Sequence, residues 1–229
     1  MINYLILTMD KQQFIKNSID SNQFIIEDVE HDNACFYNCI ATILIRKGKY
    51  NDNIIIDKDK ISKKAKQIQS KIVKWIYKNR KHKIDDLGIT LEEFVIYTHN
   101  LMEDYGIEDI EDEEIKKELM DEYYRRYSIF AGDDIEDEFD RWGGACEQYA
   151  VSQIYKIPIN VYHYKKYDDK KDKIVNGRIR NNKAERGIRF ILSQSFGTQY
   201  KDDCNYEFNV LYQNTKKIKG HYYCIYDKN

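Results

Sequence analysis

The chain has 229 residues, of which 42% are hydrophobic and 33% are charged, and its formal net charge is −2. These values predict one domain with an ordinary hydrophobic core, and neither general nucleic-acid affinity nor bulk acidity follows from that charge balance. The five cysteines form an odd set without regular or zinc-ligand spacing, which predicts a reduced, metal-free protein rather than a disulfide scaffold.

The N-terminal residues do not have the pattern of a secretory signal. Residues 2–9 are apolar, but the run is short and lacks a basic n-region and a cleavage site. No stretch approaches the roughly 20 apolar residues of a membrane-spanning helix. We therefore expect an intracellular, cytoplasmic protein, with Met9 as an alternative start. Residues 1–23, with a short helix over 10–19, are expected to form an N-terminal extension.

The stretch Asp32–Ile40 follows an extended segment at 24–26 and contains the first candidate for chemistry. The apolar run 35–45 predicts a buried helix, which places Cys35 in its first turn. A helix N-terminus carries partial positive charge and free N–H groups, so it lowers the pKa of a thiol and can hold an oxyanion. A packed core cysteine fits the same position. Small core residues are the simplest interpretation of the other four cysteines, Cys39, Cys146, Cys204 and Cys224.

The middle of the chain predicts helices with segregated charge. Apolar residues at spacings of three and four over 61–76 predict an amphipathic helix of about 20 residues. Lysines cover its other face within 58–83, which fits a nucleic-acid or membrane surface or simply a solvated face. Thr90 and Glu93 have the spacing of a capping box for a helix through Glu103.

An acidic region follows at 103–140, where 17 acidic residues stand against four basic ones. Its internal apolar positions predict helix rather than a disordered tail. The remainder of the chain is correspondingly basic.

The C-terminal part predicts a helix over 145–155 and then mainly strands. Asn176-Gly177, within the polar segment 165–187, has the signature of a type I′ hairpin turn. Strands are predicted at 157–162, 188–192, 208–212 and 222–226. Helices first and strands later indicate an α+β domain, with an α/β-like crossover, in which helices flank a small central β-sheet.

Three separate stretches, in this order, resemble the ovarian tumour (OTU) family of cysteine proteases. They are Asp32-Asn33-Ala34-Cys35, the Trp142-Gly143-Gly144 turn ahead of the strand at 157–162, and Gly220-His221-Tyr222. The resemblance spans about residues 24–227 and implies one papain-like catalytic domain over 1–229. The composition also fits a stand-alone domain of a virus or an intracellular parasite, whose protein would work in the host cytoplasm.

The resemblance implies that Cys35 is the nucleophile, His221 the general base and Asp32 the support of the oxyanion loop. An alternative role for Asp32 is to cap the helix. The resemblance also implies substrate contacts from Asn33, Ala34, Trp142, Gly143, Gly220 and Tyr222, although Trp142 fits equally a large core anchor. The remaining histidines, His31, His82, His99 and His163, are not expected to be catalytic.

The sequence departs from the family pattern at two positions. Asn33 replaces the usual glycine, and asparagine tolerates positive φ better than most residues. Tyr223 stands two residues after the histidine, where many members have an aspartate or asparagine that orients the imidazole. The chain offers two alternatives: the Tyr223 hydroxyl, or a carboxylate from the segment before the nucleophile, at Glu27, Asp28 or Glu30.

The resemblance implies a deubiquitinase that cleaves the isopeptide or peptide bond after the C-terminal Gly-Gly of ubiquitin or a ubiquitin-like modifier. We expect no cofactor, no metal, no obligatory nucleic acid, no membrane span and a monomer, and we expect the acidic region to lie beside the cleft. The alternatives are an inactive OTU-like module that binds ubiquitin, and a protein that binds nucleic acid or membrane through the basic helix.

Overall fold

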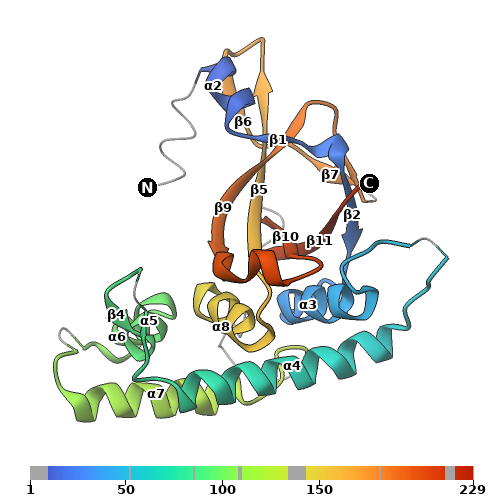
Figure 1. The fold of residues 1–229 in the computed structure, drawn as a ribbon. Helices are drawn as coiled ribbons and strands as arrows, with labels where there is room; N and C mark the ends of the chain where they lie inside the picture. The colour runs from blue at the N-terminus through green and yellow to red at the C-terminus, as the bar shows by residue number, and fades with distance from the viewer. Residues whose placement is uncertain are drawn as a thin grey trace.

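The computed structural model describes residues 10–51, 53–84, 86–107, 110–133, 143–180, 182–214 and 220–228. A mixed sheet lies above helices α3, α8 and α4 in Figure 1, while α5, α6 and α7 gather at the lower left. The α+β class predicted from the sequence is confirmed by this arrangement.

Six strands form the main sheet in the order β1 (Ile19–Asp20), β9 (Ile188–Phe196), β5 (Ile159–Asp168), β10 (Phe208–Gln213), β11 (His221–Asp227) and β2 (Phe24–Asp28). A seventh strand, β6 (Lys173–Val175), pairs with the distal half of β5. Only the β10–β5 pair is parallel among the described strands. Strand β2, which leads into α3, and the C-terminal β11 are therefore direct neighbours, whereas β1 lies at the opposite edge of the sheet.

The helices are α2 (Lys11–Lys16), α3 (Cys35–Arg46), α4 (Lys58–Lys78), α5 (Leu91–Thr98), α6 (Leu101–Tyr105), α7 (Glu113–Tyr127) and α8 (Ala145–Tyr155). Two 3-10 turns, η1 (Ser21–Gln23) and η2 (Thr198–Asp203), and two short hairpins, β3 (Lys83–Ile84) with β4 (Ile89–Thr90) and β7 (Ile179–Arg180) with β8 (Lys183–Ala184), complete the elements. Among the described residues no helix combines the length and apolar character that crossing a membrane requires.

Helix α3 lies between the sheet and α4, which explains its nearly continuous burial from Cys35 to Ile43. Alternate residues of a strand point to opposite faces. Tyr222, Cys224 and Tyr226 of β11 accordingly join the main core with α3, whereas Tyr223 and Ile225 join a second cluster on the other face. Even-numbered residues of β11 thus face α3, and its odd-numbered residues face the opposite side of the sheet.

The predicted amphipathic helix at 61–76 is confirmed as α4, which buries Ala65, Ile68, Ile72 and Ile76. The predicted capping box of Thr90 and Glu93 is also confirmed. The helix predicted through Glu103 is wrong as one element, because Asn100 adopts a left-handed conformation with φ of 52° and separates α5 from α6.

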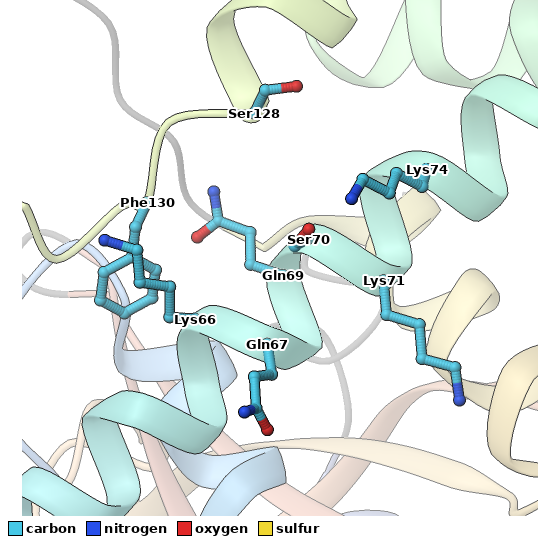
Figure 2. A pocket seen from close by; sticks show the side chains of 8 residues that line it. All are labelled: Lys66, Gln67, Gln69, Ser70, Lys71, Lys74, Ser128 and Phe130. Carbon is cyan, nitrogen blue, oxygen red and sulfur yellow. The ribbon is translucent and has the colours of Figure 1, made fainter.

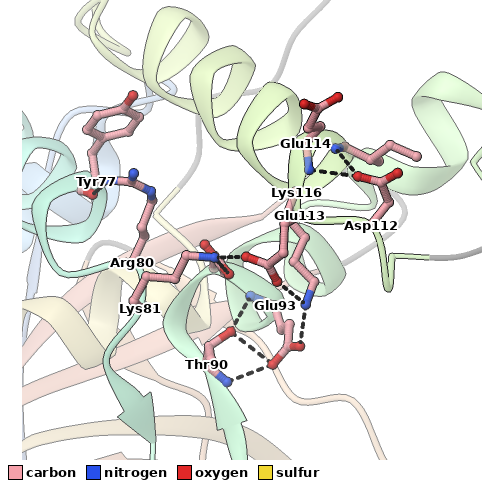
Figure 3. A network of polar contacts seen from close by, with 11 residues as sticks. Tyr77, Arg80, Lys81, Thr90, Glu93, Asp112, Glu113, Glu114 and Lys116 are labelled. Atoms are coloured by element: carbon pink, nitrogen blue, oxygen red, sulfur yellow. Dashed lines mark hydrogen bonds and ion pairs between the residues drawn. The ribbon is translucent and has the colours of Figure 1, made fainter.

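Ion pairs join the β4–α5 corner to α7 (Figure 3). Lys116 of α7 binds Glu93 at 3.1 Å, and Lys81 binds Glu113. Arg126 further along α7 binds Asp104 of α6 at 2.8 Å. Much of the acidic region is thus paired within the α5–α7 unit, and its positions 134–140 lie outside the described residues.

The hairpin predicted at Asn176-Gly177 is wrong. Strand β6 before it pairs with β5, and β7 after it pairs with β8, so the two flanking segments belong to different sheets. The Asn176 side chain accepts a hydrogen bond from Lys165 of β5 at 2.7 Å. Pairing with the long strand β5 has overridden the local turn signal.

The predicted N-terminal helix and the four predicted strands are confirmed with altered bounds. The helix over 10–19 is reduced to α2, and β1, which was not expected, pairs with β9. The strands predicted at 157–162 and 188–192 extend further as β5 and β9.

Candidate active site

Cys35 occupies the first position of α3, as the sequence predicts, and is 2% exposed. Its Sγ donates a long hydrogen bond to the carbonyl oxygen of Gly220, at 3.9 Å. Burial raises the pKa of Cys35 to about 12, although backbone N–H groups of Tyr222, Phe36 and Cys35 itself favour the thiolate. The thiol is therefore neutral in this structure, and no hydrogen bond joins it to His221 within the described part of the chain.

His221 opens β11 next to that carbonyl, and its Nε2 lies 2.9 Å from Oδ1 of Asp28. The sheet register explains this contact. Tyr223 pairs directly with Asp28 of β2, so His221, two residues before Tyr223, is a diagonal neighbour of Asp28 on the same face. The His221 side chain is 3% exposed. A buried imidazole is thus held at one nitrogen by a carboxylate from the adjacent strand.

Of the orienting groups that the sequence offered, only Asp28 forms a hydrogen bond with His221 among the described residues, while the Tyr223 ring packs edge-on against the imidazole at 4.6 Å. Glu27 instead binds Arg46 at 2.6 Å, and Glu30 lies 3.7 Å from Lys58. The Tyr223 hydroxyl donates to Oε1 of Gln213 at 2.6 Å, so this hydroxyl does not orient the imidazole by a hydrogen bond.

His31 completes this group, although sequence reasoning set it aside. Its ring stacks on His221 with centroids 3.6 Å apart and planes 9° apart. Its Nε2 lies 3.2 Å from the second oxygen of Asp28. Burial would raise the pKa of Asp28, but hydrogen bonds from His221 and His31 outweigh it and lower that pKa. One ionised carboxylate therefore binds two imidazoles.

Asp32 shapes the loop before α3. Its Oδ1 accepts the backbone N–H of Ala34 and the Nδ2–H of Asn38, both at 3.0 Å. Its own carbonyl oxygen accepts the N–H of Cys35 at 3.2 Å. The alternative role as helix cap is wrong, because Ala34 is the N-cap and has no side-chain bond to the helix. Asn33 does not adopt positive φ, so the replaced glycine is not needed for a left-handed turn here.

The Gly143-Gly144 turn packs against the nucleophile helix. A Cβ atom on Gly143 would lie 2.0 Å from Cδ1 of Phe36, the residue after Cys35. The carbonyl oxygen of Gly143 accepts the Tyr222 hydroxyl at 3.1 Å, and that hydroxyl accepts Nε2–H of Gln148 at 3.0 Å. The turn is thus fixed to α3, β11 and α8 at once.

A cluster of buried polar side chains also holds the Gly143-Gly144 turn in place. The fully buried Glu147 of α8 accepts the N–H of Gly144 at 2.8 Å and the hydroxyl of Tyr123 at 2.7 Å. His99 Nε2 lies 3.1 Å from Glu147 and 3.0 Å from Sγ of Cys146. Burial would raise the pKa of Glu147, but the charge of His99 and hydrogen bonds from His99, Cys146 and Tyr123 hold that pKa at about 2.

The structure gathers most of the residues predicted for the site. Cys35, Asp32, Ala34, Gly220, His221, Tyr222 and Gly143 lie around the α3–β11 junction. Asn33 is exposed on the loop, and Trp142 lies outside the described residues. In the sequence, the signal for Asp28 was that it shares a strand face with Phe24 and Ile26 of β2. Its contact with His221 depends on the pairing of β2 with β11, which are far apart in the sequence.

A hollow of about 560 Å³ follows α4 on its basic side (Figure 2). Lys66, which lines it, binds Asp133 at 3.0 Å and lies over the ring of Phe130, while Lys71 lies over Tyr155. Two of its lysines thus already contact groups of the same chain, which agrees with the solvated-face interpretation of the basic helix.

No protein-family model matches the chain, and no curated protein does. Among solved structures, it is similar to the viral OTU domain protease from Farallon virus, with 10% identity, coverage of 88% of this chain and 83% of that one, and a TM-score of 0.46. It is similar to an OTU deubiquitinase from Wolbachia pipientis wMel, with 12% identity, 91% coverage of each chain and a TM-score of 0.42. It is also similar to the OTU domain of OTUD1, with 10% identity, coverage of 98% and 97%, and a TM-score of 0.43.

Proposed function

We propose that this protein is a thiol-dependent deubiquitinase, which cleaves isopeptide or peptide bonds after the C-terminal Gly-Gly of ubiquitin or of a ubiquitin-like modifier. The observation that carries the proposal is the bond of His221 to Asp28 at 2.9 Å, one residue from the carbonyl that holds the Cys35 thiol. A buried imidazole aligned by a carboxylate beside a cysteine at a helix N-terminus is the arrangement that thiol proteases use.

The hydrogen-bond pattern assigns the tautomer of His221. An ionised Asp28 only accepts, so the bound Nε2 carries the proton and the neutral ring has its lone pair on Nδ1. In the proposed reaction Nδ1 takes the Cys35 proton as Sγ attacks the scissile carbonyl carbon. The imidazolium then gives that proton to the leaving amine, and Asp28 stabilises its charge meanwhile.

The thioester formed with Cys35 is hydrolysed by water, with Nδ1 of His221 acting as base again. In the tetrahedral intermediates the negative oxygen is stabilised by backbone N–H groups at the start of α3. Asp32 serves this step indirectly, because its bonds to Ala34 and Asn38 fix the backbone of the loop that supplies those groups.

A second candidate function is a ubiquitin-binding module without hydrolysis. The observation in its favour is the Cys35 thiol, which is 2% exposed and bonds to the Gly220 carbonyl rather than to His221. Burial raises its pKa to about 12. The active alternative requires that substrate binding moves Cys35 away from the Gly220 carbonyl and toward Nδ1 of His221.

Ubiquitin carrying a C-terminal electrophile separates the two functions. The proposed enzyme forms one covalent adduct, the Cys35→Ala variant forms none, and Cys39→Ala, one turn further along α3, still reacts. His221→Ala is expected to slow hydrolysis of a ubiquitin substrate by at least about 10³-fold. Wild-type protein that binds ubiquitin without forming the adduct would instead be the binding module. Retained reaction in Cys35→Ala would show that the nucleophile is wrong.

A further inference from the structure

Three metal-ligating side chains meet at the outer end of β2. The carboxylate of Asp28 and the Nε2 atoms of His31 and His221 all lie within 4.8 Å of one another. Both rings direct Nε2 toward the same carboxylate, at 3.2 Å and 2.9 Å. Two imidazoles with one carboxylate are the three-ligand set of open Zn²⁺ sites, in which water takes the fourth position.

The group is open to solvent at Asp28 and His31. A hollow of about 410 Å³ is lined by Asp28 and His31, whose side chains are 38% and 50% exposed. Glu27 and Glu30 line the same hollow, but Glu27 is paired with Arg46 and Glu30 lies 3.7 Å from Lys58. The half-exposed His31 has room to turn its Nε2 onto an ion.

The other candidate metal group, His99 with Cys146 and Glu147, differs in both respects. Glu147 is fully buried, and its two oxygens already accept from Tyr123, His99, Gly144 and Cys146. This group is a buried network in which the Glu147 carboxylate already has its hydrogen-bond partners. A metal ion would have to displace those hydrogen bonds inside the core.

We propose that Asp28, His31 and His221 form a Zn²⁺ site and that the bound metal switches off the hydrolase. The second part rests on the proposed function; the first does not. Zinc takes the lone pair of Nε2 on His221, so the proton of that nitrogen leaves and Nδ1 takes one. The imidazole stays neutral, but Nδ1 then has no lone pair to receive the Cys35 proton. The metal therefore lowers kcat rather than raising KM.

Binding is tested by calorimetric titration of ZnCl₂ into tag-free Cys35→Ala protein, which removes the nucleophilic thiol as a ligand. We expect one site per chain, weakened at least about 10-fold by adding His31→Ala. The matched control is His82→Ala, since His82 is also exposed but is not part of this metal group, and it leaves the affinity unchanged. Equal affinities in the His31 and His82 variants, or no binding to the parent, would overturn the site.

Inhibition is tested on wild-type protein with a ubiquitin substrate. We expect Zn²⁺ to reduce kcat at constant KM, EDTA to restore it, and the inhibiting concentration to rise at least about 10-fold in His31→Ala but not in His82→Ala. An unchanged inhibiting concentration in His31→Ala would place the inhibitory metal on the Cys35 thiol and overturn the switch. A protein with no hydrolysis at all refutes the proposed function and with it the switch, while the calorimetric result still decides the metal site.

Discussion

At the scale of single residues, the candidate site depends on how Asp28 divides its two oxygens. One holds His221 and the other holds His31, and both bonds require an ionised carboxylate. Many OTU-like sequences are expected to supply the orienting group two residues after the histidine. Here that residue is Tyr223, which pairs with Asp28 across the β2–β11 ladder. The carboxylate that contacts the imidazole thus comes from the neighbouring strand, on the same face of the sheet.

Removing the Asp28 carboxylate should therefore impair hydrolysis. We expect Asp28→Asn to lower kcat at least about 10²-fold, because an amide does not stabilise the imidazolium and can hold the ring in the wrong tautomer. Tyr223→Phe is the matched control, since it removes only the hydrogen bond to Gln213. Steady-state hydrolysis of a ubiquitin substrate measures both. A larger loss in Tyr223→Phe than in Asp28→Asn would assign the orienting role to the tyrosine.

At the scale of elements, the spacing of apolar residues predicted helices, because that pattern lies within one segment of the sequence. The buried run after Cys35, the amphipathic helix α4 and helix α8 were found where apolar spacing placed them. The break at Asn100 is local, but two other outcomes have non-local causes. Asn176-Gly177 forms no hairpin because β6 pairs with β5, and the β2–β11 ladder, which joins positions nearly 200 residues apart, selects Asp28 among three candidate acids. The register of the β2–β11 ladder cannot be predicted from the residue pattern of either strand alone.

The turn before α8 provides a sharp test of packing against the nucleophile helix. A Cβ on Gly143 would meet the Phe36 ring at 2.0 Å, whereas one on Gly144 would first meet Glu147 at 3.5 Å. We expect Gly143→Ala to destabilise the fold by about 1–3 kcal/mol through overpacking. Gly144→Ala is expected to be nearly neutral. Urea unfolding of the two variants decides this, and equal losses would mean that Phe36 yields without cost.

Helix α8 also gives a pH dependence. The pKa of Glu147 is about 2 in the folded chain against 4.5 for an unperturbed group. The unfolded chain thus binds the proton more readily, so stability is fully present above pH 4.5 and is lost as the pH falls toward 2. Glu147→Gln should lower stability at pH 7, and the gap from wild type should narrow on acidification. If the stability difference between wild type and Glu147→Gln did not change with pH, the charge of Glu147 would not be its cause.

At the scale of the whole molecule, charge is segregated along the chain but partly compensated in space. The acidic residues of α7 that contact basic partners do so inside the α5–α7 unit, at Lys81, Lys116, Arg125 and Arg126. Asp133, the last described acid of the region, contacts Lys66 of α4 at 3.0 Å instead. A Cβ on Gly132 would lie 3.2 Å from Oδ2 of Asp32, so the chain passes the nucleophile loop just before Asp133.

We expect the acidic residues from Asp133 onward to speed the capture of ubiquitin, whose recognition face and tail carry arginine and lysine. We expect neutralising Asp133, Asp134, Glu136 and Asp137 to raise KM several-fold with little change in kcat, and to flatten the fall of kcat/KM between low and physiological salt. The matched control removes four acids from the other end of the region, Glu103, Glu111, Glu114 and Glu118, all exposed. Its salt slope should equal that of wild type. If both variants flatten the slope equally, net charge rather than placement governs association; if neither does, the acidic end only solvates the surface.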